Sequence, residues 1–132
     1  MSARIDIIIS TIEKATGITK IQMESPSRKR EIVIARQLSM YFIRLDDLII
    51  TQRGIGAIFG NRDHSTVIHA FQTVDDHYST DKNYKAFVND LCNQINPKYS
   101  NLLGQLSLET YSFLVNKQFN KWNKKELSTL SK

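Results

Sequence analysis

The chain has 132 residues, of which 41% are hydrophobic and 23% are charged, a balance typical of a globular protein with one modest core. No apolar run approaches the length of a membrane-spanning helix, and the start MSARIDIIIS lacks the pattern of a signal peptide, so we expect no membrane association. The single cysteine, Cys92, excludes an intramolecular disulfide. We expect a small buried side chain there and a reducing, cytoplasmic environment.

The net charge of +5 is spread unevenly along the chain. Residues 1–96 contain 12 Lys/Arg against 11 Asp/Glu, whereas residues 97–132 contain 6 against 2. The overall basicity is therefore weak evidence for nucleic-acid binding, and local clustering is the better guide. Basic residues cluster at positions 28–30, and we expect four further arginines on the same side of the fold, namely Arg36, Arg44, Arg53 and Arg62. Such a patch attracts phosphates independently of sequence.

Helical periodicity dominates the first half of the chain. It predicts a first amphipathic helix that ends at Gly17, with an inward stripe of Ile5, Ile8, Ile9, Ile12 and Ala15. Thr19 is a candidate N-cap for a short second helix that carries Ile21 and Met23. From about Arg30 a long helix follows, with an apolar surface broad enough for a central position and inward residues Ile32, Ala35, Leu38, Ser39, Phe42 and Ile43.

The segment from Gly54 to Val74, GIGAIFGNRDHSTVIHAFQTV, predicts a helix, a tight turn and a second helix. Residues 48–50 should pack as the connector before it, and Thr51 is a candidate N-cap. Gly60 stands where the first helix should stop, because glycine enters the left-handed conformation without a Cβ penalty. Either Asp63 or Ser65 can cap the second helix, whose inward residues we expect to be Val67, Ile68, Ala70, Phe71 and Val74.

The run GNRDHSTVIHA closely resembles the signature of the C-terminal DNA-binding domain of the bacterial replication initiator DnaA. The resemblance extends upstream through SRKREIVIARQLSMYF, which is similar to the basic loop and long helix of that domain. It implies an all-α, TrpR-like helix-turn-helix domain over residues 1–96 that binds double-stranded DNA and needs no cofactor. The sequence contains no G-x-x-x-x-G-K-[ST] motif, so we expect neither the initiator's ATPase module nor an enzymatic activity.

The resemblance implies three groups of DNA contacts. The recognition helix opens with Asp63, His64, Ser65 and Thr66, whose carboxylate, imidazole and hydroxyl groups can read base edges in the major groove. Arg28 matches the family arginine that enters the adjacent minor groove. Expected phosphate or backbone contacts are Lys29, Arg30, Arg36, Arg44, Gln52, Arg53 and Arg62, although Arg36 can instead pair with an internal acid. We expect His69 to be packed within its helix.

The C-terminal quarter lies outside the resemblance. Asp81 can cap a further helix that Pro97 closes, and residues 97–132 are expected to form a helical extension with Ser107 as a cap. Its apolar stripe consists of Leu108, Tyr111, Val115, Phe119 and Trp122. This helix either folds back onto the domain or docks, through residues 107–123, on a protein partner or a second copy of the chain.

Three classes of function remain open. The first is a sequence-specific DNA binder that recognises sites like those of the initiator, in replication initiation or its control, or as a transcriptional regulator, on a chromosome or on a phage or mobile element. The second is a protein-interaction module that has kept the fold. The third is a nuclease, for which the paired acids 46–47 and 75–76 are the only candidate metal ligands, and helix ends explain them adequately. The histidine spacing does not suit a metal, so we expect none.

Overall fold

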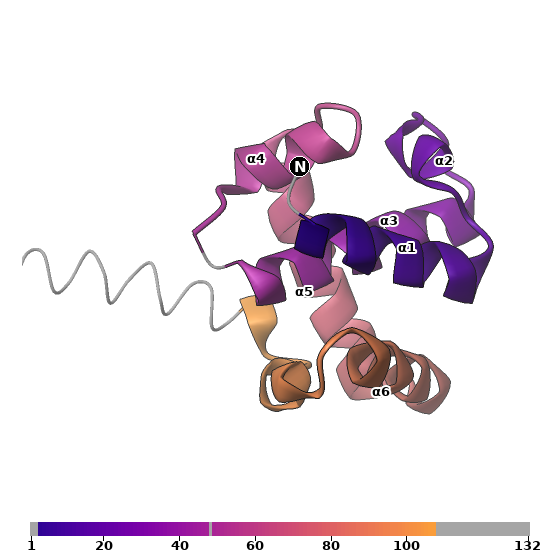
Figure 1. Cartoon of the computed structure of the whole chain (residues 1–132), viewed down its shortest axis with the longest axis vertical. Coiled ribbons are helices and arrows are strands. Elements are labelled where there is room, and N and C mark those ends of the chain that lie inside the picture. Colours follow the sequence, from indigo (N-terminus) through magenta and orange to yellow (C-terminus); the bar gives the residue numbers. More distant parts are fainter. Residues whose placement is uncertain (1–2, 48, 108–132) are drawn as a thin grey trace, which may run out of the picture.

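The computed structural model describes residues 3–47 and 49–107, and over these residues the fold is all-α, as predicted. Six α-helices and one 3₁₀-helix follow one another along this part of the chain (Figure 1). They are α1 (Ala3–Thr16), α2 (Lys20–Glu24), α3 (Arg30–Asp46), α4 (Gln52–Ile58), α5 (His64–Thr80), α6 (Lys82–Ile95) and η1 (Pro97–Leu102).

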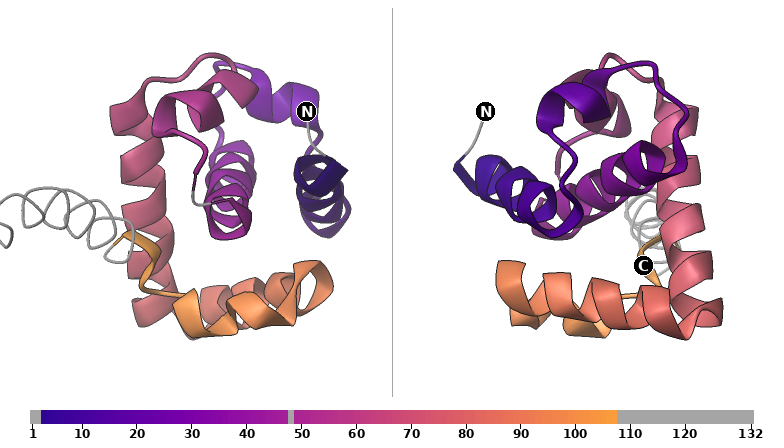
Figure 2. Two further views of the ribbon diagram at one scale, coloured as in Figure 1. Left: turned by 60° about the vertical axis from the view of Figure 1, so that its left-hand side comes forward. Right: turned by 90° about the vertical axis from the view of Figure 1, so that its right-hand side faces the viewer.

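Helix α3 is the centre of the fold. It packs against α1 and α5 along its length, and it also contacts α2 and α4. Figure 2 shows α3 between α1 and α5, with α6 lying across the end of this layer. Its inward residues are buried as predicted, and Met40 and Tyr41 are buried as well, so three sides of the helix face protein. An apolar surface this broad requires neighbours on several sides, which explains the central position.

Three positions predicted to pack are wrong, namely Ala15, Ile49 and Ile68, and Ile21, for which no inward position was predicted, is exposed as well. Ala15 is exposed, Ile21 is 79% exposed, Ile49 is 89% exposed and Ile68 is 37% exposed. Helix α2 has only five residues, so Met23 alone reaches the core from it. In the connector, the Ile49 N–H donates to Asp47 Oδ1, and this turn directs the side chain outward. On α5, Val67, Ala70, Phe71 and Val74 form the buried stripe, and position 68 lies about 100° around the helix from position 67.

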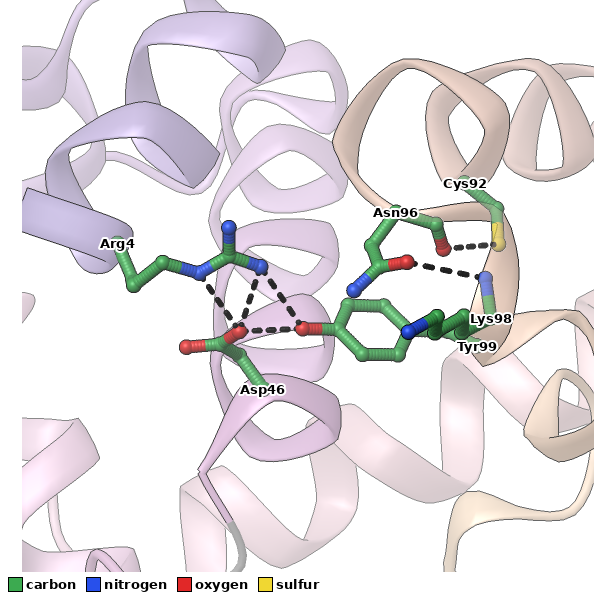
Figure 3. A network of polar contacts seen from close by, with 6 residues as sticks. All are labelled: Arg4, Asp46, Cys92, Asn96, Lys98 and Tyr99. Carbon is green, nitrogen blue, oxygen red and sulfur yellow. Dashed lines mark hydrogen bonds and ion pairs between the residues drawn. The ribbon is translucent and has the colours of Figure 1, made fainter.

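The chain after α6 returns to the core. Leu103 and Leu106 are buried with the other apolar side chains, and Cys92 is buried as expected. The Tyr99 hydroxyl and the Arg4 guanidinium both donate to Asp46 at the end of α3, which links η1, α1 and α3 (Figure 3). Asn96 accepts the Lys98 N–H at 3.0 Å and so caps η1. Residues 97–107 therefore belong to the packed structure.

The predicted apolar stripe from Leu108 to Trp122 and the proposed docking segment beyond residue 107 lie outside the described residues. The division of the chain at residue 96 stays a prediction.

Candidate nucleic-acid interface

The helix-turn-helix is built by two capped helices and a left-handed turn. Thr51 caps α4, accepting the Gly54 N–H at 2.9 Å, and Asp63 caps α5, accepting the Thr66 N–H at 2.8 Å. Between them, Gly60 and Asn61 have φ values of 82° and 57°, the left-handed region that glycine and asparagine tolerate best. The predicted turn and its caps are confirmed, with Asp63 rather than Ser65 as the N-cap.

Gly56 fixes how closely the turn folds back on α4. Its carbonyl oxygen accepts the N–H groups of Phe59 and Arg62, at 3.1 and 3.0 Å. A methyl group at position 56 would lie 1.9 Å from the Arg62 carbonyl oxygen, which is backbone and cannot swing away. The angle between α4 and α5 therefore depends on the absence of a side chain at this position.

The first turn of α5 presents a polar, exposed edge. Asp63, His64, Ser65 and Thr66 are all exposed, and the apolar stripe of α5 begins only at Val67. The Thr66 backbone N–H holds the pKa of the Asp63 carboxyl below its ordinary value, so this carboxyl is ionised at neutral pH. One edge of a helix end thus combines an anionic acceptor, an imidazole and two hydroxyls, which suits hydrogen bonding to base edges.

The basic loop lies beside this helix end. The loop that follows α2 and the turn between α4 and α5 occupy the same end of the molecule (Figures 1 and 2). Arg28, Lys29 and Arg30 are exposed, and their side chains make no hydrogen bond or ion pair with the described residues. Their charges are therefore available to an external anion.

Arg36 is a correction to the predicted DNA contacts. It is 6% exposed, and its guanidinium donates to the carbonyl oxygens of Met23, Ser25 and Ser27 at 2.6, 3.0 and 3.1 Å. Among the described residues no acid accepts from it, so the alternative of an ion pair with an internal acid is also wrong there. Burial, with a contribution from Arg62, lowers the pKa of Arg36 to about 10. These hydrogen bonds join the basic loop to α3 in the interior of the protein.

Arg44 is a second correction. Only 3% of this residue is exposed; its Nη1 donates to the Asp47 carbonyl oxygen at 3.2 Å, and its guanidinium lies 5.8 Å from the centre of the Phe71 ring. Burial lowers its pKa, and Nε has no partner among the described residues. The guanidinium is enclosed between α3 and α5, so it does not face a DNA backbone.

Arg62 is half-buried and connects the turn to the basic loop. Its Nη2 donates to the Ser25 carbonyl oxygen at 2.7 Å, and its Nη1 donates to the Phe59 carbonyl oxygen. With Arg28, Arg36 and Thr66 it lines an open hollow of about 470 Å³ between the loop and the start of α5. This hollow has several guanidinium groups and one carboxylate, Glu24, at its edge.

The remaining predicted contacts lie at α4. Arg53 is exposed and Gln52 is partly exposed, both in the first turn of that helix. His69, predicted to be packed, is exposed, and it lines a second hollow of about 460 Å³ with Arg28, Arg30, Gln37 and His77, among others. His69 and His77 are eight residues apart, about two turns of α5. This spacing is the signal in the sequence that could have placed both histidines on one outer face of the helix.

The sequence of this chain matches a known protein family. Residues 5–74 match the family described as "Bacterial dnaA protein helix-turn-helix", which is more than half of the 132 residues. The chain belongs to this family. The match runs from α1 to Val74 in α5 and so includes the helix-turn-helix and the basic loop. The DnaA-like domain is a non-catalytic DNA-binding module, and it binds double-stranded DNA.

Several chromosomal replication initiator proteins DnaA are similar to this chain. The protein of Flavobacterium psychrophilum is 45% identical over 69 residues, which is 52% of this chain and 14% of that protein. The protein of Bacteroides thetaiotaomicron is 37% identical over 87 residues, covering 66% of this chain and 18% of the relative. The protein of Picosynechococcus is 31% identical over 97 residues, covering 74% and 21%. The chain thus spans about a fifth or less of these relatives. No solved structure matches it.

Within residues 3–47 and 49–107, no helix is long and apolar enough to cross a membrane, and no three potential metal ligands come together.

Proposed function

We propose that this chain binds duplex DNA sequence-specifically, at sites like those of the DnaA initiator, and that it acts in replication initiation or its control in the bacterial cytosol. The observation that supports this most directly is the pairing of two exposed elements at one end of the molecule. One is the polar first turn of α5, and the other is the basic loop with its unpaired Arg28. Two such elements fit adjacent grooves of one duplex.

The start of α5 lies in the major groove in this proposal. The Asp63 carboxylate still has acceptor capacity beyond its bond to the Thr66 N–H, and a cytosine amino group is its natural donor. His64, which is exposed beside it, can donate to or accept from a base edge. Ser65 offers a hydroxyl group but no methyl group, so it cannot make a methyl contact with thymine at this position.

Arg28 lies in the neighbouring minor groove. A narrow A·T-rich minor groove concentrates negative potential and attracts an arginine without requiring a base-specific hydrogen bond. The DNA strand that separates the two grooves then crosses the hollow between Arg28 and Thr66. Arg62 has further N–H groups beyond the two used on carbonyl oxygens, and these can bind a phosphate there. The buried Arg36 adds positive charge below the surface of this hollow and makes no direct contact with the DNA.

Selection from a pool of random duplexes tests the proposal without assuming a site. The full chain is mixed with the pool at physiological salt, and bound duplexes are recovered and sequenced over several rounds. We expect enrichment of one motif related to the initiator box TTATCCACA, with positions contacted by α5 the least variable. Recovery of no common motif would contradict sequence-specific binding and favour a partner-recruiting module with non-specific DNA affinity.

A further inference from the structure

Asp75 is a buried carboxylate on the recognition helix, far along α5 from the residues that face DNA. It is 6% exposed, yet no cationic side chain pairs with it among the described residues. Its Oδ1 accepts the Tyr41 hydroxyl at 2.6 Å and the Leu106 N–H at 3.1 Å. Its Oδ2 accepts the Ser107 N–H at 2.6 Å and also the Ser107 hydroxyl. Four donors from two distant segments therefore converge on one carboxylate.

The donors after α6 belong to a short segment that we call the strap, residues 103–107. Its apolar side chains, Leu103 and Leu106, are buried, and the Gly104 N–H donates to the Tyr41 hydroxyl oxygen at 3.0 Å. Figure 2 shows the chain leaving α6 and η1 and returning to the side of α5 in both views. The strap thus touches α5 through Asp75 and α3 through Tyr41.

The strap and the carboxylate depend on each other physically. An ionised carboxylate inside a protein is costly unless hydrogen-bond donors replace the water that it loses. Three of the four donors on Asp75 come from the strap, so its departure would leave the carboxylate with only the Tyr41 hydroxyl. Helix α5 would then have to shift or open to rehydrate Asp75.

We propose that Asp75 is a positioning residue for the recognition helix, and that the strap latches it, so that DNA recognition depends on residues beyond the family region 5–74. The inference rests on the proposed function. Helix α5 carries both the reading turn at its start and Asp75 in its fourth turn, so a shift of the helix at Asp75 also shifts its start. A small displacement at Asp75 therefore misplaces the side chains that meet the bases.

The test uses full-length Asp75→Asn, Ser107→Ala and Asp76→Asn proteins. Asp76 is an exposed neighbour whose side chain makes no hydrogen bond or ion pair with the described residues, so Asp76→Asn removes the same charge without touching the latch. Dissociation constants for a cognate and a scrambled duplex are measured well below each melting temperature, with circular dichroism confirming the fold. We expect Asp75→Asn and Ser107→Ala to reduce the cognate-to-scrambled ratio roughly 3- to 30-fold, whereas Asp76→Asn leaves it unchanged.

A merely structural role would lower the melting temperature but leave this ratio intact, and that result in folded Asp75→Asn and Ser107→Ala proteins overturns the proposal. If Asp75→Asn does not fold, the cognate-to-scrambled ratio of Ser107→Ala provides the test, because this variant removes only the Ser107 hydroxyl and keeps the Ser107 N–H as a donor to Asp75. If the unmodified chain prefers no duplex, the proposed function fails separately. Hydrogen exchange of the α5 amides then tests whether the strap holds α5 through Asp75. Faster exchange in Asp75→Asn than in Asp76→Asn supports this role, and equal exchange refutes it.

Discussion

Arg36 and Arg62 donate to the same acceptor, the carbonyl oxygen of Ser25, from two different parts of the fold. The Arg36 Nη2 reaches it from α3 at 3.0 Å, and the Arg62 Nη2 reaches it from the helix-turn-helix turn at 2.7 Å. Two guanidinium groups therefore tie the basic loop to both the central helix and the turn. This arrangement holds the basic loop, and with it Arg28, next to the turn that precedes α5.

Arg36→Met should loosen the basic loop and lower the free energy of unfolding. The substitution leaves the Met23 and Ser27 carbonyl oxygens without this donor and removes one of the two donors on the Ser25 carbonyl oxygen, and unsatisfied buried polar groups typically cost about 1–3 kcal/mol. Arg30→Met is the matched control, because Arg30 is exposed and its side chain makes no hydrogen bond or ion pair with the described residues, and its cost should stay within about 0.5 kcal/mol. Urea denaturation of both variants measures the difference. Equal unfolding free energies would show that Arg36 does not fasten the loop.

Gly56→Ala should destabilise the helix-turn-helix more than Gly54→Ala. The new methyl at position 56 meets the Arg62 carbonyl oxygen at 1.9 Å, so backbone must move, at a cost of at least about 1–3 kcal/mol. At position 54 the methyl meets only side-chain atoms, at 3.1 Å from Ile50 and 3.2 Å from Thr51. The Ile50 side chain can yield, a shift of Thr51 Oγ1 weakens its cap on the Gly54 N–H, and alanine is the better helix former, so the net change should be within about 1 kcal/mol. Thermal unfolding of both variants tests the ranking, and a reversed order contradicts it.

Stability should fall at alkaline pH because of the buried Tyr41 and the partly buried Tyr84. Burial raises the pKa of Tyr41 and Tyr84 above the ordinary value of 10.0. Below pH 10 both the folded and the unfolded chain keep these protons, so their contribution to stability is fully present. Above about pH 10 the unfolded chain releases protons that the folded chain retains, and the free energy of unfolding declines as pH rises.

Tyr84→Phe is the cleaner variant for this test, since the Tyr84 hydroxyl makes no hydrogen bond to the described residues. Urea denaturation at several pH values between about 8 and 11 gives the slope of stability against pH. The slope above pH 10 should be shallower in Tyr84→Phe than in the unmodified chain. An identical slope would mean that the folded protein does not hold the Tyr84 proton.

Lys29→Ala and Arg53→Ala should weaken DNA binding without changing its sequence preference. Both side chains are exposed and unpaired within the described part of the chain, which suits contact with phosphates. Each loss of a phosphate contact should reduce the slope of log affinity against log salt by about 1, equally for cognate and scrambled duplexes. Titrations at four salt concentrations measure this. A change confined to the cognate duplex would instead assign the residue to base reading.

Local rules explain why much of the fold was predictable. Thr19, Thr51, Asp63 and Asp81 are each N-caps in the structure, because capping depends on a side chain and the N–H groups two or three residues later. The turn at Gly60 follows from the backbone requirement of the turn itself. The family match then supplies what such local rules cannot, namely that this particular helix-turn-helix belongs to a DNA-binding domain.

Tertiary relationships explain where sequence reasoning failed. An arginine in a basic region resembles a phosphate contact, and only the folded structure shows that Arg36 donates to three carbonyl oxygens and that the Arg44 guanidinium lies over the Phe71 ring. The sequence likewise indicates only an ordinary helix end at Asp75, because its donors in the strap lie more than thirty residues away. Whether the exposed residues of α5 and the loop contact DNA stays a prediction.

The most direct test of the central claim is a fluorescence-anisotropy titration of the full chain at physiological salt. One labelled duplex carries the box TTATCCACA, and the control is a scrambled duplex of equal composition. Sequence-specific reading predicts a preference of at least roughly tenfold, about 1.4 kcal/mol, and His64→Ala and Arg28→Ala should each remove about 1–3 kcal/mol of binding to the box. Equal affinity for both duplexes, unchanged by either substitution, would contradict recognition of initiator-like sites through α5 and the basic loop.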